Sequence, residues 1–338
     1  MSFATSSDFD AALGDLPRPD QAAIAAARAR QAQLTKPAGS LGRLEDIALF
    51  LAGWQGREIP ALRRGQAAIF AGNHGVVAQG VSAFPAAVTA QMVANFRAGG
   101  AAINALADAA GLELTIVAIE LDRPTRDFTQ GPAMSEAECL AALSAGAEAV
   151  DPALDLLVVG EMGIGNSTAA AALCARSFGG DPADWVGPGT GLDDSGLARK
   201  GAAVAAALDV HADAPHGPLE TLRRVGGREI AAIAGAIVRA RHLRIPVLLD
   251  GFICCSALAP LAVANPAIVE HCIAGHCSAE PGHGRLLDRL GLDPLLRLDM
   301  RLGEGSGAAV AMGVIRAALA AHERMATFAQ AGIAGGPA

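Results

Sequence analysis

A lone carboxylate in a glycine-rich segment is the strongest candidate for a catalytic group. Glu304 lies in Arg301-Leu-Gly-Glu-Gly-Ser-Gly307, after an apolar stretch and before a predicted helix. The apolar neighbours Met300 and Leu302 should raise its pKa by desolvation, which is the direction that a general base working near neutral pH requires. The alternative is a structural carboxylate that interacts with the dipole at a helix N-terminus.

A second carboxylate precedes a glycine-rich turn. Glu161 lies in Gly160-Glu-Met-Gly-Ile-Gly-Asn-Ser-Thr168, which leads into an alanine-rich helix. A turn of this kind before a helix N-terminus can bind an anion through its backbone N–H groups. It is no Walker loop, because no Gly-Lys-Ser/Thr follows. Because a carboxylate repels phosphate, Glu161 should meet a sugar hydroxyl or a cationic ring, or else bond to loop amides. The candidate anion ligands are Gly163, Gly165, Asn166, Ser167 and Thr168, of which Asn166 or Ser167 would also cap the helix.

Four further polar residues follow or enter predicted elements. Lys200 could reach a phosphate or remain solvated on its helix. Asp250, at the end of a strand, could bind a ribose hydroxyl or cap the next helix, and Ser278 lies in a polar loop able to hold phosphate. His74, in Gly72-Asn-His-Gly75, could act as a base or simply fix a turn.

A segment rich in histidine and cysteine spans residues 271–283. Its three histidines and two cysteines fit no standard zinc spacing, and no second half-site accompanies them, so we expect no metal. None of the six cysteines of the chain forms a Cys-x-x-Cys pair. We interpret most of them as small buried hydrophobes in a reducing compartment, while the purpose of Cys254-Cys255 is left open.

Short apolar runs alternate with helical stretches along most of the chain. Such alternation predicts an α/β fold, a Rossmann-like doubly wound, mainly parallel sheet covered on both faces. In such a sheet ligands bind at the carboxyl ends of the strands, where the polar motifs lie. The predicted strands are 67–71, 114–120, 156–160 and 246–249, and the predicted helices are 86–110, 167–178, 197–211 and 227–242.

The two ends of the chain have a different pattern. They contain helical stretches with no strand between them, so we expect a small helical subdomain formed by both termini. The helices are predicted at 18–35, 44–56 and 306–330, with a loose tail at 331–338. The predicted division is a large α/β domain at 60–304 and a small helical domain made of 1–59 and 305–338.

Composition narrows the class of protein. The net charge is −8, and the basic residues are scattered, so no nucleic-acid or anionic-membrane surface is expected. The N-terminus lacks the basic and apolar regions of a signal peptide. The longest apolar stretch, 308–321, is interrupted by Arg316 and is too short to span a bilayer. We therefore expect a soluble, cytoplasmic protein.

Six motifs, in one order over about residues 15 to 325, resemble the nicotinate-nucleotide:dimethylbenzimidazole phosphoribosyltransferases of cobalamin assembly. The resemblance implies a homodimer with a Rossmann-like large domain and a small helical domain. It also implies transfer of the 5-phosphoribosyl group of nicotinate mononucleotide to 5,6-dimethylbenzimidazole, with neither a metal nor a redox cofactor. The motifs are Lys36–Glu45, His74–Val76, Gly160–Thr168, Leu248–Phe252, Ser278–His283 and Met300–Ala308.

The resemblance also implies roles for individual residues. Glu304 would be the general base, and Glu161 would lie close to the substrates and assist. The phosphate and ribose would be bound by the loop from Gly163 to Thr168, with Lys200, Asp250 and Ser278. The base pocket would be lined by Phe84, Gln91, Met92, Met162 and Leu302.

The sequence departs from the family at two places. Asn73 stands where many relatives have Asp before His-Gly, and the glutamine of the base pocket falls at Gln91 or is replaced by Met92. Both concern which base is accepted, so transfer to adenine or to another benzimidazole remains an alternative.

Two other classes of function share part of the pattern. A nicotinamide-dinucleotide oxidoreductase would have the same doubly wound sheet, but no Gly-x-Gly-x-x-Gly opens the first βα unit with an acidic residue about twenty positions on. A non-catalytic carrier would bind a base or nucleotide and release no nicotinate.

Overall fold

A five-stranded parallel sheet forms the centre of the molecule. The computed structural model describes residues 1–189 and 191–334. The strand order is β2-β1-β3-β4-β5, and every neighbouring pair is parallel. The order reverses between β1 and β3, which is where ligands bind in sheets of this kind. The strands are β1 (Gly65–Ala71), β2 (Glu113–Ala118), β3 (Leu156–Met162), β4 (Val247–Leu249) and β5 (Cys272–Ala274).

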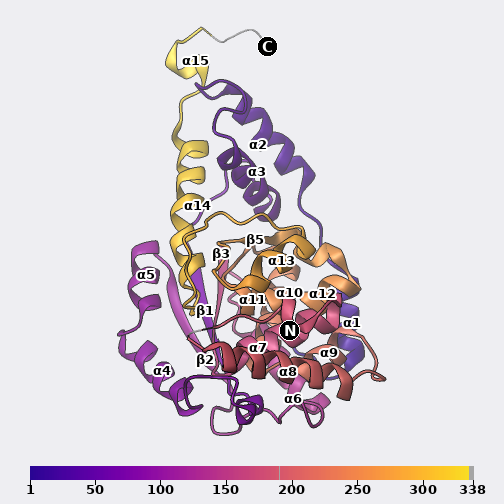
Figure 1. Ribbon diagram of the computed structural model, residues 1–338. Helices are drawn as coiled ribbons and strands as arrows, with labels where there is room; N and C mark the ends of the chain where they lie inside the picture. Colours follow the sequence, from indigo (N-terminus) through magenta and orange to yellow (C-terminus); the bar gives the residue numbers. More distant parts are fainter. Residues whose placement is uncertain (190, 335–338) are drawn as a thin grey trace.

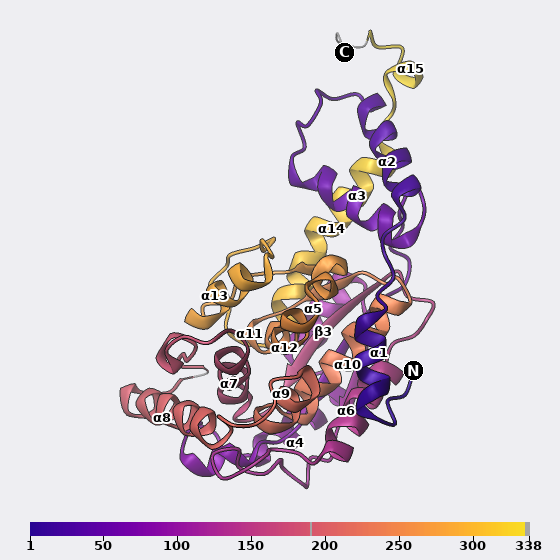
Figure 2. The same cartoon turned by 90° about the vertical axis from the view of Figure 1, so that its right-hand side faces the viewer.

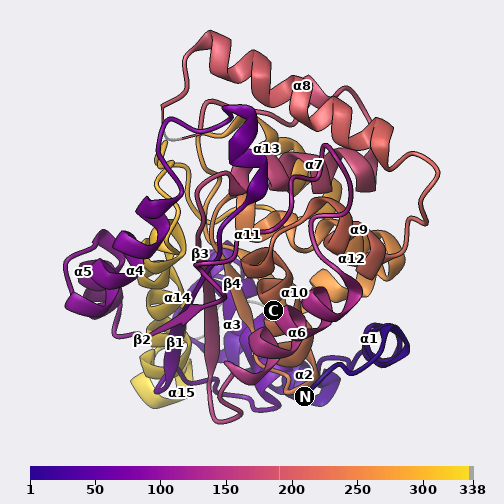
Figure 3. The ribbon, with the colours of Figure 1, turned by 90° about the horizontal axis from the view of Figure 1, so that it is seen from below.

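Helices cover both faces of the sheet, which confirms the predicted α/β class (Figure 1, Figure 3). One face packs against α6 (Glu136–Glu148), α7 (Asn166–Phe178) and α10 (Arg228–His242), and the other against α5 (Ala102–Ala110) and α14 (Ser306–Arg324). The remaining helices are α1 (Ser6–Gly14), α2 (Gln21–Gln33), α3 (Arg43–Gln55), α4 (Ala87–Ala98), α8 (Asp194–Val210), α9 (Pro218–Val225), α11 (Phe252–Ser256), α12 (Ala259–Ala264), α13 (Pro281–Leu290) and α15 (Phe328–Ala331).

Two predicted helices are interrupted. The stretch 86–110 is divided into α4 and α5, because Gly99 adopts a left-handed conformation with φ of 81° and ends α4. The stretch 306–330 is divided because Met325 turns to an extended conformation after α14. Thr327 then starts α15 with a capping box.

Strand β5 escaped prediction because its three residues stand between polar neighbours, Glu270-His271 and His276, whereas β4, which is equally short, belongs to an apolar run from Ile245. It lies inside the histidine- and cysteine-rich segment 271–283, where no strand was predicted. Each of its residues is paired with one residue of β4, so Cys272 lies beside Val247 and Ala274 beside Leu249. Because β5 is part of the sheet, the polar residues that follow it reach the same sheet edge as those after β3 and β4.

The terminal segments lie in two places. Helices α2 and α3 stand beside the distal part of α14 in both views (Figure 1, Figure 2). Arg30 donates to the carbonyl oxygen of His322 at 2.8 Å, which ties α2 to α14. In contrast, α1 packs against the α/β layer, where His242 Nε2 lies 2.8 Å from the carbonyl oxygen of Ala12.

The position of α1 differs from the expectation that all of residues 1–59 join the C-terminal helix. Phe9 and Leu13 of α1 belong to the core that α6 and α10 form. The division into two domains remains a prediction. Of the predicted tail, residues 335–338 lie outside the described part of the chain. Across the described residues, none of the helices combines the length and apolarity that crossing a membrane needs.

Candidate active site

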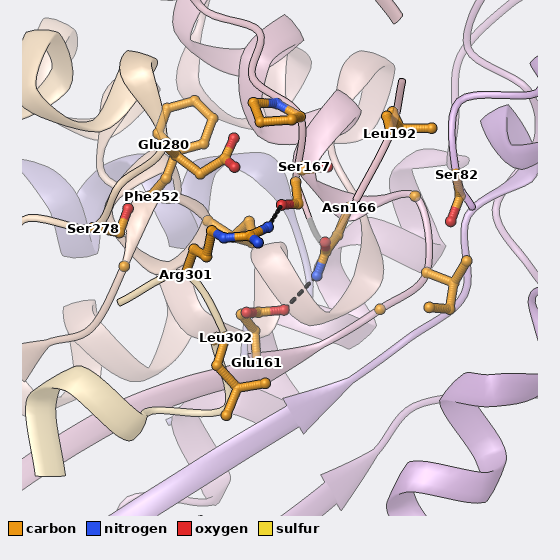
Figure 4. A pocket seen from close by; sticks show the side chains of 18 of the residues that line it. Ser82, Glu161, Asn166, Ser167, Leu192, Phe252, Ser278, Glu280, Arg301 and Leu302 are labelled. Carbon is orange, nitrogen blue, oxygen red and sulfur yellow. Dashed lines mark hydrogen bonds between the residues drawn. The ribbon is translucent and has the colours of Figure 1, made fainter. Parts of the chain in front are cut away.

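A cleft opens at the carboxyl ends of β3, β4 and β5 (Figure 4). Predicted site residues from several separate motifs meet there, although they are up to 141 positions apart in the sequence. They are Glu161, Met162, Gly163, Gly165, Asn166, Ser167, Lys200, Ser278 and Leu302. The cleft therefore brings together candidates for phosphate binding, for base binding and for proton transfer.

The glycine-rich turn connects β3 to α7 along one wall of the cleft. Gly165, with φ of 94°, is the N-cap of α7, and no side chain caps this helix, which corrects the prediction for Asn166 and Ser167. The turn is held from outside, because the backbone N–H of Ile164 donates to Thr89 Oγ1 at 3.1 Å. Because residues 163–167 line the cleft, the uncapped helix N-terminus faces it. The positive end of the helix dipole there favours an anion.

Lys200 is buried and faces this turn, so the alternative of a solvated lysine is wrong. Its side chain is 1% exposed, and its ammonium donates to Ser167 Oγ at 3.1 Å and to the carbonyl oxygen of Gly187 at 2.7 Å. Burial lowers the pKa of Lys200, while nearby Glu280 opposes the shift. Because an ammonium has three donors, one remains for a ligand.

Glu161 lines the cleft and points toward Asn166 (Figure 4). Burial raises its pKa to about 8, and the charge of Asp250 adds to the shift. Asn166 opposes it, because its side-chain N–H group donates to Glu161 Oε2. This bond explains why Asn166 does not cap α7.

Glu304 is buried but is absent from the cleft lining. Gly303 and Leu302 before it do line the cleft. Burial raises the pKa of Glu304, as predicted, and the charge of Asp250 adds to it. Leu302 is half exposed, so the burial comes from the sheet side of Glu304, whose backbone lies against Gly160.

The surroundings of Glu304 fit both predicted interpretations, a general base and a carboxylate at a helix N-terminus. Its carboxyl lies near the backbone N–H of Ile103 in the first turn of α5, and this N–H favours the charged form. The helix N-terminus that Glu304 meets is thus that of α5 and not that of α14, which follows it. Among the described residues its Oε2 atom has no hydrogen-bond partner, so one oxygen remains free to accept a proton.

Asp250 lies behind the cleft and holds a helix. Its two carboxylate oxygens accept from the backbone N–H groups of Gly305 at 3.1 Å and Ala308 at 2.9 Å. Asp250 therefore stabilises the start of α14, which is distant in sequence, and does not cap α11, the helix that follows it directly. It is 1% exposed and does not line the cleft, so the predicted ribose contact has no support in this geometry.

The segment after β5 provides a polar wall. Ser278 lines the cleft, and its hydroxyl lies 2.9 Å from His283 Nδ1. His276 also lines the cleft, whereas the ring nitrogens of the buried His271 lie 2.9 and 3.1 Å from the carbonyl oxygens of Ile268 and Ile237. Within 1–189 and 191–334, no group of three or more His, Cys, Asp or Glu side chains is arranged to hold a metal ion.

Only two of the five predicted base-pocket residues line the cleft. Met162 and Leu302 line the cleft, whereas Gln91 is exposed on α4 and Met92 packs against the core on the sheet face that α5 and α14 cover. Phe84 is 45% exposed and follows Ser82 and Ala83, which do line the cleft. Thr168, predicted as an anion ligand, is fully buried and also lies outside the lining.

Sequence reasoning missed several lining residues. Glu280 and Arg301 lie within the quoted motifs, so their charge could have singled them out, and Arg301 Nη1 donates to the carbonyl oxygen of Gly189 at 3.1 Å. Phe252 also lies in a motif, but Ser82 had no signal in the sequence. Glu161 and Glu280 are the acidic side chains that line the cleft in the described part of the chain.

Replacing Gly163 with alanine should destabilise the glycine-rich turn. A methyl group at this position would lie 2.7 Å from the carbonyl oxygen of Gly72 and 2.9 Å from Glu229 Oε1, both too close. We expect a loss of about 1–3 kcal/mol in the free energy of unfolding, as for other overpacked sites, measured by denaturant titration. The matched control is Gly201→Ala inside α8, where no atom outside the helix's own backbone lies within 4 Å, so stability should not fall and should rise by up to about 1 kcal/mol from helix propensity. Equal stability of the two variants would contradict the tight packing.

Comparison with known proteins identifies the family. A family model described as phosphoribosyltransferase matches residues 16–333. The nicotinate-nucleotide–dimethylbenzimidazole phosphoribosyltransferase of Novosphingobium aromaticivorans is 72% identical over 334 residues, which cover 99% of each chain. The protein of the same name from Ruegeria sp. is 60% identical over 332 residues and 98% of each chain.

A solved structure agrees with the sequence relatives. The crystal structure of CobT from Thermus thermophilus matches with a TM-score of 0.88 at 45% identity. The match covers 93% of this chain and 100% of that one. The resemblance inferred from the six motifs is thereby confirmed. This chain belongs to the phosphoribosyltransferase family that includes the nicotinate-nucleotide–dimethylbenzimidazole phosphoribosyltransferases.

Proposed function

We propose that this chain transfers the 5-phosphoribosyl group of nicotinate mononucleotide to 5,6-dimethylbenzimidazole. The products are α-ribazole 5′-phosphate and nicotinate. The chain is thus a glycosyltransferase of the pentosyl-transfer kind, acting in the assembly of the cobalamin nucleotide loop. The observation that carries the proposal is the 72% identity to a relative of this name over almost the whole chain.

The phosphate of nicotinate mononucleotide would bind at the N-terminus of α7. Lys200, with one free donor, and the uncapped turn from Gly163 to Ser167 lie on the same side of the cleft. A dianionic phosphate gains from both the ammonium charge and the helix dipole. Ser278 faces the cleft from the segment after β5 and would complete this phosphate site.

The benzimidazole would lie against Met162 and Leu302, toward Glu304. Leu302 and Phe84 are half-exposed apolar side chains on or beside the cleft, as expected for residues that an apolar ring would cover. Glu304 follows Leu302 and Gly303 directly, and its pKa is raised by burial. It would take the N–H proton of the base.

The chemistry balances without another reactant. The bond between the anomeric carbon and the pyridinium nitrogen breaks, and its electron pair stays on the departing nicotinate. The unprotonated imidazole nitrogen attacks the opposite face, so a β-linkage becomes an α-linkage. The imidazole N–H proton passes to Glu304. The sugar carries positive charge while the bonds exchange, as in glycoside hydrolysis. Glu161 in its ionised form would stabilise this charge, and the positive charge beside it in turn favours ionisation of Glu161.

Two finer points complete the proposal. The chain would act as a homodimer and would work in the cytoplasm. The homodimer rests on the family resemblance, and the location rests on the composition and apolar pattern of the sequence. Sedimentation of the purified chain tests the first.

The proposal is tested by incubating the purified chain with nicotinate mononucleotide and a panel of bases. We expect α-ribazole 5′-phosphate and nicotinate in equal amounts, identified by mass. A preference for adenine or another benzimidazole would assign the alternative base. Binding of both substrates without release of nicotinate would indicate the non-catalytic carrier, and an absorbance change that depends on nicotinamide dinucleotide would indicate the oxidoreductase.

A further inference from the structure

A buried histidine–carboxylate pair lies behind the glycine-rich turn. His74 follows β1, and Glu229 lies in the first turn of α10. Their side chains are 0% exposed, and His74 Nε2 lies 2.6 Å from Glu229 Oε1. Neither residue lines the cleft, and the mechanism above uses neither. A buried charge is costly unless it is paired, so the pair requires a reason.

Three glycines make room for the Glu229 carboxylate. A methyl group on Gly72, Gly163 or Gly227 would lie between 2.7 and 2.9 Å from one of its oxygens. Gly72 directly follows β1, Gly163 begins the turn after β3, and Gly227 is the N-cap of α10. The carboxylate therefore packs between the start of its own helix and two other chain segments, after β1 and after β3, where the strand order reverses.

The pair contacts the turn that carries the cleft residues. The position of a methyl group on Gly163 is 2.9 Å from Glu229 Oε1 and 3.2 Å from Asn166 Nδ2. Asn166 in turn donates to Glu161 Oε2, and the backbone N–H of Asn166 donates to the carbonyl oxygen of Gly163 at 3.1 Å. A continuous set of contacts thus leads from His74 to Glu161.

We propose that His74 and Glu229 are positioning residues for the transfer reaction, holding the Gly163–Asn166 turn so that Asn166 presents Glu161 to the sugar. The inference rests on the proposed function, because it assigns Glu161 to the same cleft. His74 fixes the carboxylate of Glu229, Glu229 supports the turn, and the turn fixes Asn166. Glu161 is the residue through which the pair acts.

Electrostatics supports the same connection. The groups that act on Glu161 are Asp250 after β4, Glu229 on α10, Glu304 before α14 and Asn166 on α7. The negative charge of Glu229 is one of the causes that raise the pKa of Glu161. Removing that charge lowers the pKa of Glu161, so Glu161 ionises at lower pH.

The test compares Glu229→Gln and His74→Gln with the wild-type chain, using nicotinate mononucleotide and dimethylbenzimidazole. We expect kcat to fall by up to about 10²-fold, since small misplacements in an active site can cost this much, while KM for nicotinate mononucleotide changes little. We also expect the acidic limb of the kcat–pH profile of Glu229→Gln to move to lower pH. In a Glu161→Gln background, Glu229→Gln should have no further effect on kcat or on the limb.

The matched control is Glu270→Gln, which removes the carboxylate paired with the buried Arg241 at the far end of the same helix. It should leave the pH profile unchanged. The inference is overturned if Glu229→Gln keeps wild-type kcat and pH profile, or if it lowers kcat equally with and without Glu161. If Glu229→Gln does not fold, kcat of His74→Gln is compared with and without Glu161 instead. Failure of the wild-type chain to release nicotinate would instead refute the proposed function.

Discussion

Replacing Glu304 with glutamine should lower kcat for transfer to dimethylbenzimidazole by on the order of 10²–10⁴-fold, the contribution that a well-placed general base makes. Glutamine keeps the size of the side chain but takes no proton. The raised pKa of Glu304 suits a base near neutral pH, and its Oε2 atom has no hydrogen-bond partner among the described residues. Initial rates of nicotinate release measure the effect, and the thermal unfolding midpoint shows whether the fold is kept.

The same measurement on Glu161→Gln separates the two carboxylates. Glu161 faces the cleft, whereas Glu304 lies behind Gly303. If Glu304 takes the proton, Glu304→Gln should be the more damaging change, because Glu161 contributes only its charge. Suppose that Glu304→Gln folds and keeps near wild-type turnover while Glu161→Gln is inactive. Glu161 would then be the general base.

The pH dependence of the wild-type chain follows from the direction of the Glu304 shift. A base acts in its ionised form, so kcat should rise with pH as Glu304 loses its proton. Because burial raises the pKa of Glu304, this rise should come at higher pH than for an exposed glutamate. In Glu304→Gln this step should be missing from the profile, whereas the step that belongs to Glu161, whose pKa burial raises to about 8, should remain.

The sheet could be predicted because its strands are apolar and separated by long helices. β1 and β3 are buried along nearly their whole length, so their sequences contain continuous apolar runs. β4 and β5 have three residues each, but β4 continues an apolar run, whereas β5 stands between histidines and is a strand only through its pairing with β4. The division of 86–110 depends on the left-handed conformation of Gly99, which no apolar pattern reports.

The site was predicted where a motif carried both the residue and its surroundings. Glu161 and the turn that follows it lie next to each other in sequence and in the cleft. The role of Asp250 depends on backbone N–H groups of Gly305 and Ala308, so it could not be inferred from the residues beside it. The same holds for Asn166, whose side chain bonds to Glu161 in place of the helix N-terminus.

Replacing Lys200 with methionine should weaken binding of nicotinate mononucleotide. Methionine fills the buried space but removes the ammonium that lies between Ser167 and the carbonyl oxygen of Gly187. A hydrogen bond to a charged group contributes roughly 1.5–3 kcal/mol, which corresponds to about a tenfold to 10²-fold rise in KM for this substrate. Steady-state kinetics with nicotinate mononucleotide as the varied substrate measure the rise.

The second substrate provides the internal control for Lys200→Met. Dimethylbenzimidazole carries no phosphate, so its KM should stay unchanged if Lys200 contacts only the phosphate. A parallel rise in both KM values would show that the methionine disturbs the cleft as a whole, for example by releasing the carbonyl oxygen of Gly187. An unchanged KM for nicotinate mononucleotide in a folded variant would place the phosphate elsewhere, and the uncapped N-terminus of α7 would lose its proposed ligand. The position of the phosphate fixes where the anomeric carbon lies relative to Glu161, so this variant tests the orientation of the whole substrate in the cleft.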